Sequence, residues 1–138
     1  AHAAGERGEV PVGAVVVHDG QIIPSEGNRR RQLSDPSGHA EILALRSAGA
    51  ALGDWRLETC TLSVTLEPCP MCAAACRQAR LQLVIWGAED RLIGACGSSI
   101  DLAQDPRIGP ALAQRGGLLA EDASALLESF FAKQRVSS

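Results

Sequence analysis

The stretch Val64-Thr65-Leu66-Glu67-Pro68-Cys69-Pro70-Met71-Cys72, together with His39-Ala40-Glu41 earlier in the chain, decides how this sequence is interpreted. An apolar run ends there in a Cys-x-x-Cys pair at the predicted start of a helix. Both thiolates can reach one metal ion, and a helix N-terminus favours their ionised form. His39 can be the third ligand. A zinc ion with three protein ligands keeps its fourth position open for water, which is typical of catalytic sites, and Glu41 is then free to move protons.

The bulk composition indicates one domain spanning residues 1–138. The chain has 138 residues, 46% of them hydrophobic, which is enough for one compact core. Its net charge of −3 gives no global electrostatic reason to bind nucleic acid. The five cysteines are an odd number in a chain large enough to fold without disulfides, which favours a reducing cytoplasm over secretion. No apolar run reaches the length of a membrane span, so no membrane partner is expected.

Hydrophobic periodicity and turn signals predict alternating strands and helices. Residues 1–9 are expected to form an irregular stub, and residues 24–38 an ordered loop. A hairpin is predicted from residues 10–17 and 22–23 around the Asp-Gly turn. The remaining predicted elements are strands at 61–66 and 81–87, helices at 39–51, 70–78 and 121–134, and a short helix near 106–115. This alternation predicts an α/β fold in which helices pack on a partly parallel sheet.

A Cys-x-x-Cys pair alone is also typical of redox dithiols, structural zinc sites and iron-sulfur ligands. A structural site would need a second Cys pair or a further histidine, and Cys60, Cys76 and Cys96 show no paired spacing. Cys76 is interpreted as an ordinary buried thiol, with a redox neighbour of Cys72 as the alternative. A thioredoxin-like dithiol would leave the His-x-Glu motif without a role. His-x-Glu with Pro-Cys-x-x-Cys is the signature of zinc deaminases, so the sequence predicts a zinc-dependent hydrolase.

The predicted ligands are His39, Cys69 and Cys72, and the predicted general acid and base is Glu41. Zinc lowers the pKa of its water toward roughly 7. Glu41 then accepts the water proton, passes it to the ring nitrogen beside the reacting carbon, and later helps to protonate the departing ammonia. Residues two apart on a regular helix point roughly 200° apart. His39 and Glu41 can therefore face one ion only if His39 lies at the very start of its helix.

Most of the chain resembles a bacterial tRNA adenosine deaminase of the cytidine deaminase superfamily. This resemblance implies a three-layer α/β/α sandwich with a mixed, roughly five-stranded sheet, and a homodimer. It also implies conversion of adenosine to inosine at the wobble position of a tRNA anticodon stem-loop. The matching stretches are residues 8–15, Asn28, residues 35–41, 55–57, 64–72, 87–90 and 94–98, and Phe130-Phe131.

The resemblance also implies substrate contacts. Asn28 would hydrogen-bond the flipped base, Val10 and Leu66 would line its pocket, and Asp90 would touch a flanking nucleotide. Ala40 and Pro68, beside the metal ligands, complete the expected substrate contacts. The alternatives are a loop-stabilising amide for Asn28 and plain core packing for Val10 and Leu66.

The sequence departs from the family on the side that would meet RNA. Where the family usually has a basic Arg-Asp-x-Lys loop, this chain has Glu89-Asp90-Arg91-Leu92, and its C-terminal basic tail is reduced. Fewer phosphate contacts weaken RNA binding. One alternative is therefore a deaminase of a free base or nucleoside such as guanine, cytosine or cytidine, and another is a structural zinc or nucleic-acid-binding module. The Arg29-Arg30-Arg31 run is either a phosphate contact or a solvated surface.

Overall fold

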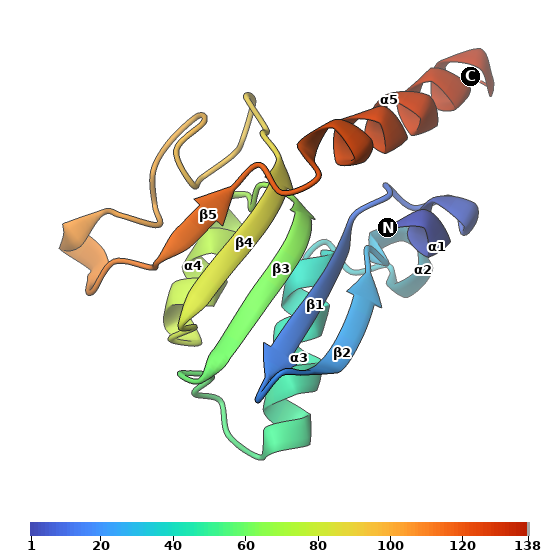
Figure 1. The fold of residues 1–138 in the computed structure, drawn as a ribbon. Helices are drawn as coiled ribbons and strands as arrows, with labels where there is room; N and C mark the ends of the chain where they lie inside the picture. Colours follow the sequence, from blue (N-terminus) through green and yellow to red (C-terminus); the bar gives the residue numbers. More distant parts are fainter. Residues whose placement is uncertain (138) are drawn as a thin grey trace.

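The computed structural model describes residues 1–137, which form a five-stranded sheet in the order β2-β1-β3-β4-β5 with helices packed against it (Figure 1). Strand β1 pairs antiparallel with β2 and β3, whereas the β3–β4 and β4–β5 pairs are parallel. This mixed sheet confirms the predicted α/β class. The elements in chain order are α1 (His2–Glu6), β1 (Gly13–His18), β2 (Gln21–Gly27), α2 (Arg30–Leu33), α3 (Ala40–Leu52), β3 (Cys60–Leu66), α4 (Pro70–Gln78), β4 (Leu83–Ala88), the 3-10 helix η1 (Pro106–Ile108), β5 (Gln114–Gly116) and α5 (Ala120–Ser137).

The main core lies between the sheet and the helices α3 and α4, which cover one face together (Figure 1). Alternate strand residues point into it: Val16, Leu62 and Val84 are fully buried, while their neighbours on the other face are half-buried. Small residues on α3 and α4, such as Ala44 and Ala73, allow the helices to approach the sheet closely. Helix α5 contacts β3 and β4 on the opposite face.

The strand directions bring the carboxyl ends of three strands to one edge of the sheet. Because β1 is antiparallel to both neighbours, β2 runs in the same direction as β3 and β4. Asn28 follows β2, Glu67 follows β3 and Glu89 follows β4. Helices α3 and α4 begin at this edge as well (Figure 1). In sheets with parallel strands, ligands bind outside these carboxyl ends.

The structure corrects two predictions in the N-terminal third. Residues 1–9 are not a stub, since α1 forms there and buries Ala4. The predicted loop 24–38 contains the end of β2 and the short helix α2. Strand β2 continues through Pro24 because it lies at the sheet edge, where a residue without an N–H leaves no neighbouring strand unpaired.

The prediction of a short helix near residues 106–115 is also wrong. Only η1 forms, and Gly109 follows it with a φ of 107°, a conformation that favours glycine, before Pro110. The chain then pairs with β4 as β5, an arrangement that local periodicity does not reveal. Among residues 1–137, none of the helices combines the length and apolar character that a membrane span requires.

Candidate active site

His39 is the N-cap residue of α3, and this position explains how a His-x-Glu pair can serve one site. Its backbone is extended, with φ of −70° and ψ of 151°, so its side chain leaves the helix direction. Glu41 lies in the first turn of α3 and is buried. The condition set by helical geometry, that His39 must lie at the helix start, is therefore met.

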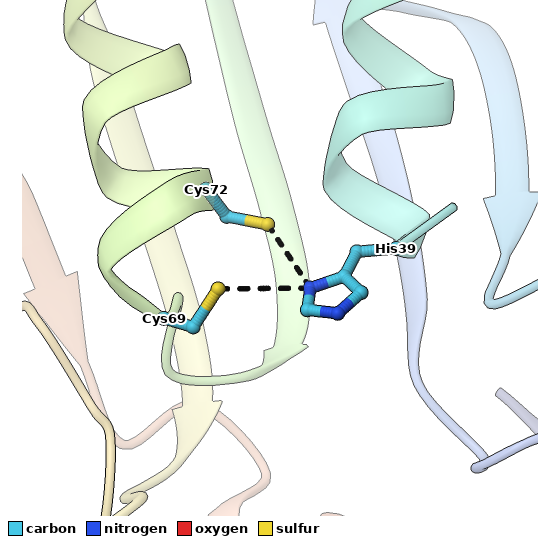
Figure 2. Close-up of side chains that lie close together, drawn as sticks. All are labelled: His39, Cys69 and Cys72. Carbon is cyan, nitrogen blue, oxygen red and sulfur yellow. Dashed lines mark hydrogen bonds between the residues drawn. The ribbon is translucent and has the colours of Figure 1, made fainter. Parts of the chain in front are cut away.

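The two cysteines lie at the start of α4 in the equivalent position. Cys69 is the N-cap, Pro70 occupies the first turn, where its fixed φ suits a helix, and Cys72 follows one turn on. Figure 2 shows both sulfurs directed at the Nδ1 atom of His39, which lies 3.6 Å from Cys69 Sγ and 3.4 Å from Cys72 Sγ. All three candidate ligand atoms lie within 4.8 Å of one another.

These distances fit a zinc ion. Bonds of about 2.3 Å to sulfur and about 2.1 Å to nitrogen, at tetrahedral angles, separate the ligand atoms by roughly 3.5 Å. The nitrogen–sulfur distances of 3.4 and 3.6 Å match this separation. Three protein ligands leave one tetrahedral position for water or substrate.

The electrostatics of the cluster favour metal binding. The hydrogen bond from Cys72, together with the nearby His39, lowers the pKa of Cys69 to about 4 against the opposing effect of burial. The same Cys69 contact and burial raise the pKa of Cys72. The hydrogen bond with Cys69 raises the pKa of His39. One thiolate charge is thus present without metal, and a bound zinc ion displaces the remaining protons.

Burial raises the pKa of Glu41, while His39 lowers it to a smaller extent. A carboxyl group with a raised pKa can both accept and return a proton near neutral pH, as a general acid and base must.

A cavity of about 480 Å³ opens beside this cluster and is lined by His39, Glu41 and Cys69. Five of the six expected substrate contacts also line it: Val10, Asn28, Ala40, Leu66 and Asp90. Pro68 does not line it: this residue is fully buried, and its carbonyl accepts a hydrogen bond from the Ala95 amide. The cavity also has walls that the sequence did not suggest, from Ile93 in the loop after β4 and from Leu127 and Phe131 of α5.

The sequence model of the cytidine and deoxycytidylate deaminase zinc-binding region matches residues 1–88 of this chain. The chain belongs to the cytidine and deoxycytidylate deaminase family. It is 44% identical to the tRNA-specific adenosine deaminase of Agrobacterium fabrum, over 99% of this chain and 90% of that protein. It is thus a zinc-dependent hydrolytic deaminase, as its His-Cys-Cys cluster and motifs predict.

Solved structures of related enzymes share the fold of this deaminase. One, from a study of tRNA:A34 deaminases that edit the wobble position, has a TM-score of 0.88 and 44% identity, and the match covers 91% of each chain. A guanine deaminase from Nitrosomonas europaea has a TM-score of 0.79 and 27% identity, covering 95% of this chain and 78% of that one. These matches confirm the cytidine deaminase-like fold.

Two buried carboxylates of the deaminase were not singled out by sequence reasoning. Glu67 accepts backbone hydrogen bonds from the loop after β4. Glu9 accepts the amides of Arg31 and Gln32 at 3.0 and 2.8 Å, which holds α2 beside the cavity. Each is 2% exposed. The sequence signal for each was a glutamate next to an apolar or proline-containing stretch. Only the tertiary structure shows which amides donate hydrogen bonds to its carboxylate.

The structure separates the members of the Arg29-Arg30-Arg31 run. The Arg29 side chain donates to Gln32 Oε1 at 2.7 Å and lies 3.8 Å from Glu26. Arg31 donates to the Gly8 carbonyl at 3.4 Å. Arg30 is exposed and lines the active-site cavity together with a second cavity that adjoins it. Cys76, by contrast, is fully buried in the core, as expected for an ordinary thiol.

Proposed function

We propose that this deaminase converts adenosine to inosine at the wobble position of a tRNA anticodon. The observation that carries the proposal is the 44% identity to a tRNA-specific adenosine deaminase over nearly the whole of both chains. The match extends over the loops around the cavity as well as over the metal motifs. The neighbouring cavity, lined by Arg30 and Arg31 and sharing Asn28 with the active site, gives a flanking nucleotide room beside a flipped base.

In the proposed reaction, adenosine and water give inosine and ammonia. His39, Cys69 and Cys72 would hold the zinc ion, which when bound supplies a water molecule of lowered pKa. Glu41 accepts a proton from the attacking water and delivers it to the ring nitrogen beside the reacting carbon. It then returns a proton to the departing amino group, so that ammonia leaves. Burial keeps this carboxyl out of bulk water, and proton transfer therefore stays within the cavity.

The base would be oriented by the residues at the carboxyl ends of the strands. The Asn28 side-chain oxygen accepts the Arg30 amide at 3.1 Å, and this contact fixes the side chain. In the described part of the chain no hydrogen bond involves its side-chain amide nitrogen, and Asn28 lines the cavity. It is therefore available to donate to a ring nitrogen or carbonyl of the base. Val10 and Leu66 would supply apolar contact for the base, and Asp90 would meet a neighbouring nucleotide.

A second candidate is deamination of a free purine such as guanine. It is favoured by the acidic Glu89 and Asp90 at the cavity, which repel phosphate, and by the structural similarity to a guanine deaminase. Two observations favour the RNA substrate: the cation Arg30 also lines this cavity, and the identity to tRNA deaminases is higher.

Ammonia release decides between the two. The assay compares a tRNA anticodon stem-loop containing a wobble adenosine with free adenosine, cytidine, cytosine and guanine. We expect turnover of the stem-loop alone. Turnover of guanine or another free compound without the stem-loop would overturn the proposal in favour of the second candidate. A stem-loop in which guanosine replaces the wobble adenosine serves as the matched control and should release no ammonia.

We also infer that the working form is a homodimer in a reducing compartment such as the cytoplasm. Leu92 beside the cavity is 87% exposed, which suits a side chain covered by a second copy. All five cysteines are free thiols, as expected in a reducing compartment. Sedimentation of the purified protein tests the dimer directly.

A further inference from the structure

Glu67 is a buried carboxylate to which the proposed chemistry gives no role. It lies between the end of β3 and the ligand Cys69, and its side chain is 2% exposed. In the described part of the chain, no ion pair involves it. A buried charge without a counter-ion is costly unless hydrogen bonds satisfy it. Its hydrogen bonds therefore indicate what it is for.

All the donors come from one segment, the loop after β4. Glu67 Oε1 accepts the Asp90 amide at 3.1 Å and the Ser98 hydroxyl. Glu67 Oε2 accepts the amides of Cys96 at 2.9 Å and Ser98 at 3.1 Å. One carboxylate thus joins the beginning and the end of this loop, so that each oxygen is satisfied by the protein alone.

The loop is closed tightly around this carboxylate. A Cβ atom on Gly94 would lie 2.5 Å from Glu67 Cδ. The backbone at Gly94 therefore passes closer to the carboxylate than a residue with a side chain could. The Ala95 amide adds a hydrogen bond of 2.8 Å to the Pro68 carbonyl. The consecutive residues Glu67, Pro68 and Cys69 therefore hold the loop and offer a metal ligand from the same short stretch of backbone.

The same loop forms one wall of the active-site cavity through residues 89–93, opposite Val10 and Asn28. We propose that Glu67 is a positioning residue: it holds this wall at a set distance from the His-Cys-Cys cluster, and so sets the width of the space in which the base binds. The inference rests on the proposed function, because it assumes that the substrate base enters this cavity. Glu67 also lines this cavity, but in the described part of the chain its hydrogen bonds all go to the loop and none goes to Glu41 or to a candidate metal ligand.

The variant Glu67→Gln tests the proposal with little change in size. A glutamine can keep its oxygen toward the amides of Cys96 and Ser98, but its NH2 group then faces the Asp90 amide, which also donates. The part of the loop at Cys96 and Ser98 therefore stays bonded to residue 67, whereas the part at Asp90 loses its hydrogen bond. We expect KM for the stem-loop to rise about tenfold, the effect of one lost hydrogen bond to a charged group, with kcat within about threefold of the parent. Zinc content should stay unchanged.

Two further variants separate positioning from general stability. Arg77→Met removes a side chain that holds the later part of the connection between β4 and β5 through the carbonyls of Leu102, Asp105 and Pro110, none of which lines the cavity or bonds to Glu67. It should lower the unfolding temperature without changing KM. Ser98→Ala removes only the hydroxyl donor to Glu67 and leaves no buried group unsatisfied. It should raise KM about threefold, and it keeps the proposal testable if Glu67→Gln does not fold.

Amide hydrogen exchange gives a readout that needs no substrate. The Asp90 amide should exchange slowly in the parent and much faster in Glu67→Gln, whereas the amides of Cys96 and Ser98 stay protected. An unchanged KM with an unchanged Asp90 exchange rate would overturn the proposal. So would a loss of kcat together with zinc, which would make Glu67 a support of the metal site. If the parent turns over a free base instead of the stem-loop, the proposed RNA substrate fails while the exchange experiment still decides the role of Glu67.

Discussion

Glu41, the candidate general acid and base, shows how the surroundings of a single residue change its chemistry. It lies in the first turn of α3, is 4% exposed, and has a pKa raised by burial. His39, two residues earlier, points to the same site only because its backbone is extended. The chemistry of the pair therefore depends on the position of the helix boundary as much as on residue type.

Replacing the carboxyl by an amide separates proton transfer from metal binding. We expect Glu41→Gln to lower kcat by about a thousandfold or more, since a positioned general acid and base contributes roughly 10² to 10⁴. Zinc content, measured by elemental analysis, should equal that of the parent. Glu58→Gln, an exposed carboxylate before β3, is the control and should keep full activity. A Glu41→Gln enzyme with near-normal kcat would refute the assigned role.

At the scale of elements, α2 is a four-residue helix that is held in place from outside. The Glu9 carboxylate accepts hydrogen bonds from two of its backbone amides, and the Asn28 side chain accepts one from a third. These side chains satisfy N–H groups that have no partner within so short a helix. This arrangement directs successive arginines to different surroundings. Arg29 is engaged by neighbouring side chains, whereas Arg30 faces the two adjoining cavities.

The two arginines give a matched pair of variants for RNA binding. We expect Arg30→Ala to weaken stem-loop binding, and to reduce the slope of log K against log salt by about 0.7, the value for one phosphate contact on single-stranded nucleic acid. Arg29→Ala should leave the slope unchanged. Titrations at several salt concentrations measure both. Equal slopes for the parent and the Arg30→Ala protein would return Arg30 to the solvated-surface interpretation.

At the scale of the whole molecule, the candidate metal ligands come from two helices that lie side by side on one face of the sheet (Figure 1). His39 comes from the start of α3, and Cys69 and Cys72 come from the start of α4. A bound zinc ion therefore links segments 30 residues apart in the chain. Because the unfolded chain has no preformed site, metal binding also stabilises the fold.

Removing zinc should consequently lower the unfolding temperature. Binding at a thousand times Kd contributes about 4 kcal/mol, which for a chain of this size corresponds to a shift of roughly 10 °C. Scanning calorimetry with a chelator, and again after zinc is restored, measures the shift. The His39→Ala protein is the control, since its unfolding temperature should not respond to zinc in this range. Identical unfolding temperatures for the zinc-loaded and chelated parent would contradict the bridging role.

Patterns within a few residues were sufficient to predict much of the molecule. The hairpin turn, the helices α3, α4 and α5 and the strands β3 and β4 follow from local periodicity and turn chemistry, and their bounds differ from the predicted ones by a few residues at most. The candidate ligands and Glu41 were found for the same reason, because motif spacing is a local property. The one-domain organisation and the homodimer remain predictions.

The sequence by itself therefore determined the α/β class, the three candidate ligands and the candidate catalytic carboxylate. Only the tertiary structure decided that Asn28, Glu67 and Glu89 meet at one edge of the sheet, that Arg30 rather than Arg29 faces the cavity, and that residues 114–116 form a strand. The physical reason is the range of the interactions. Helix and turn preferences act over a few neighbouring residues, whereas the pairing of β5 and the hydrogen bonds of Glu67 join segments more than twenty residues apart.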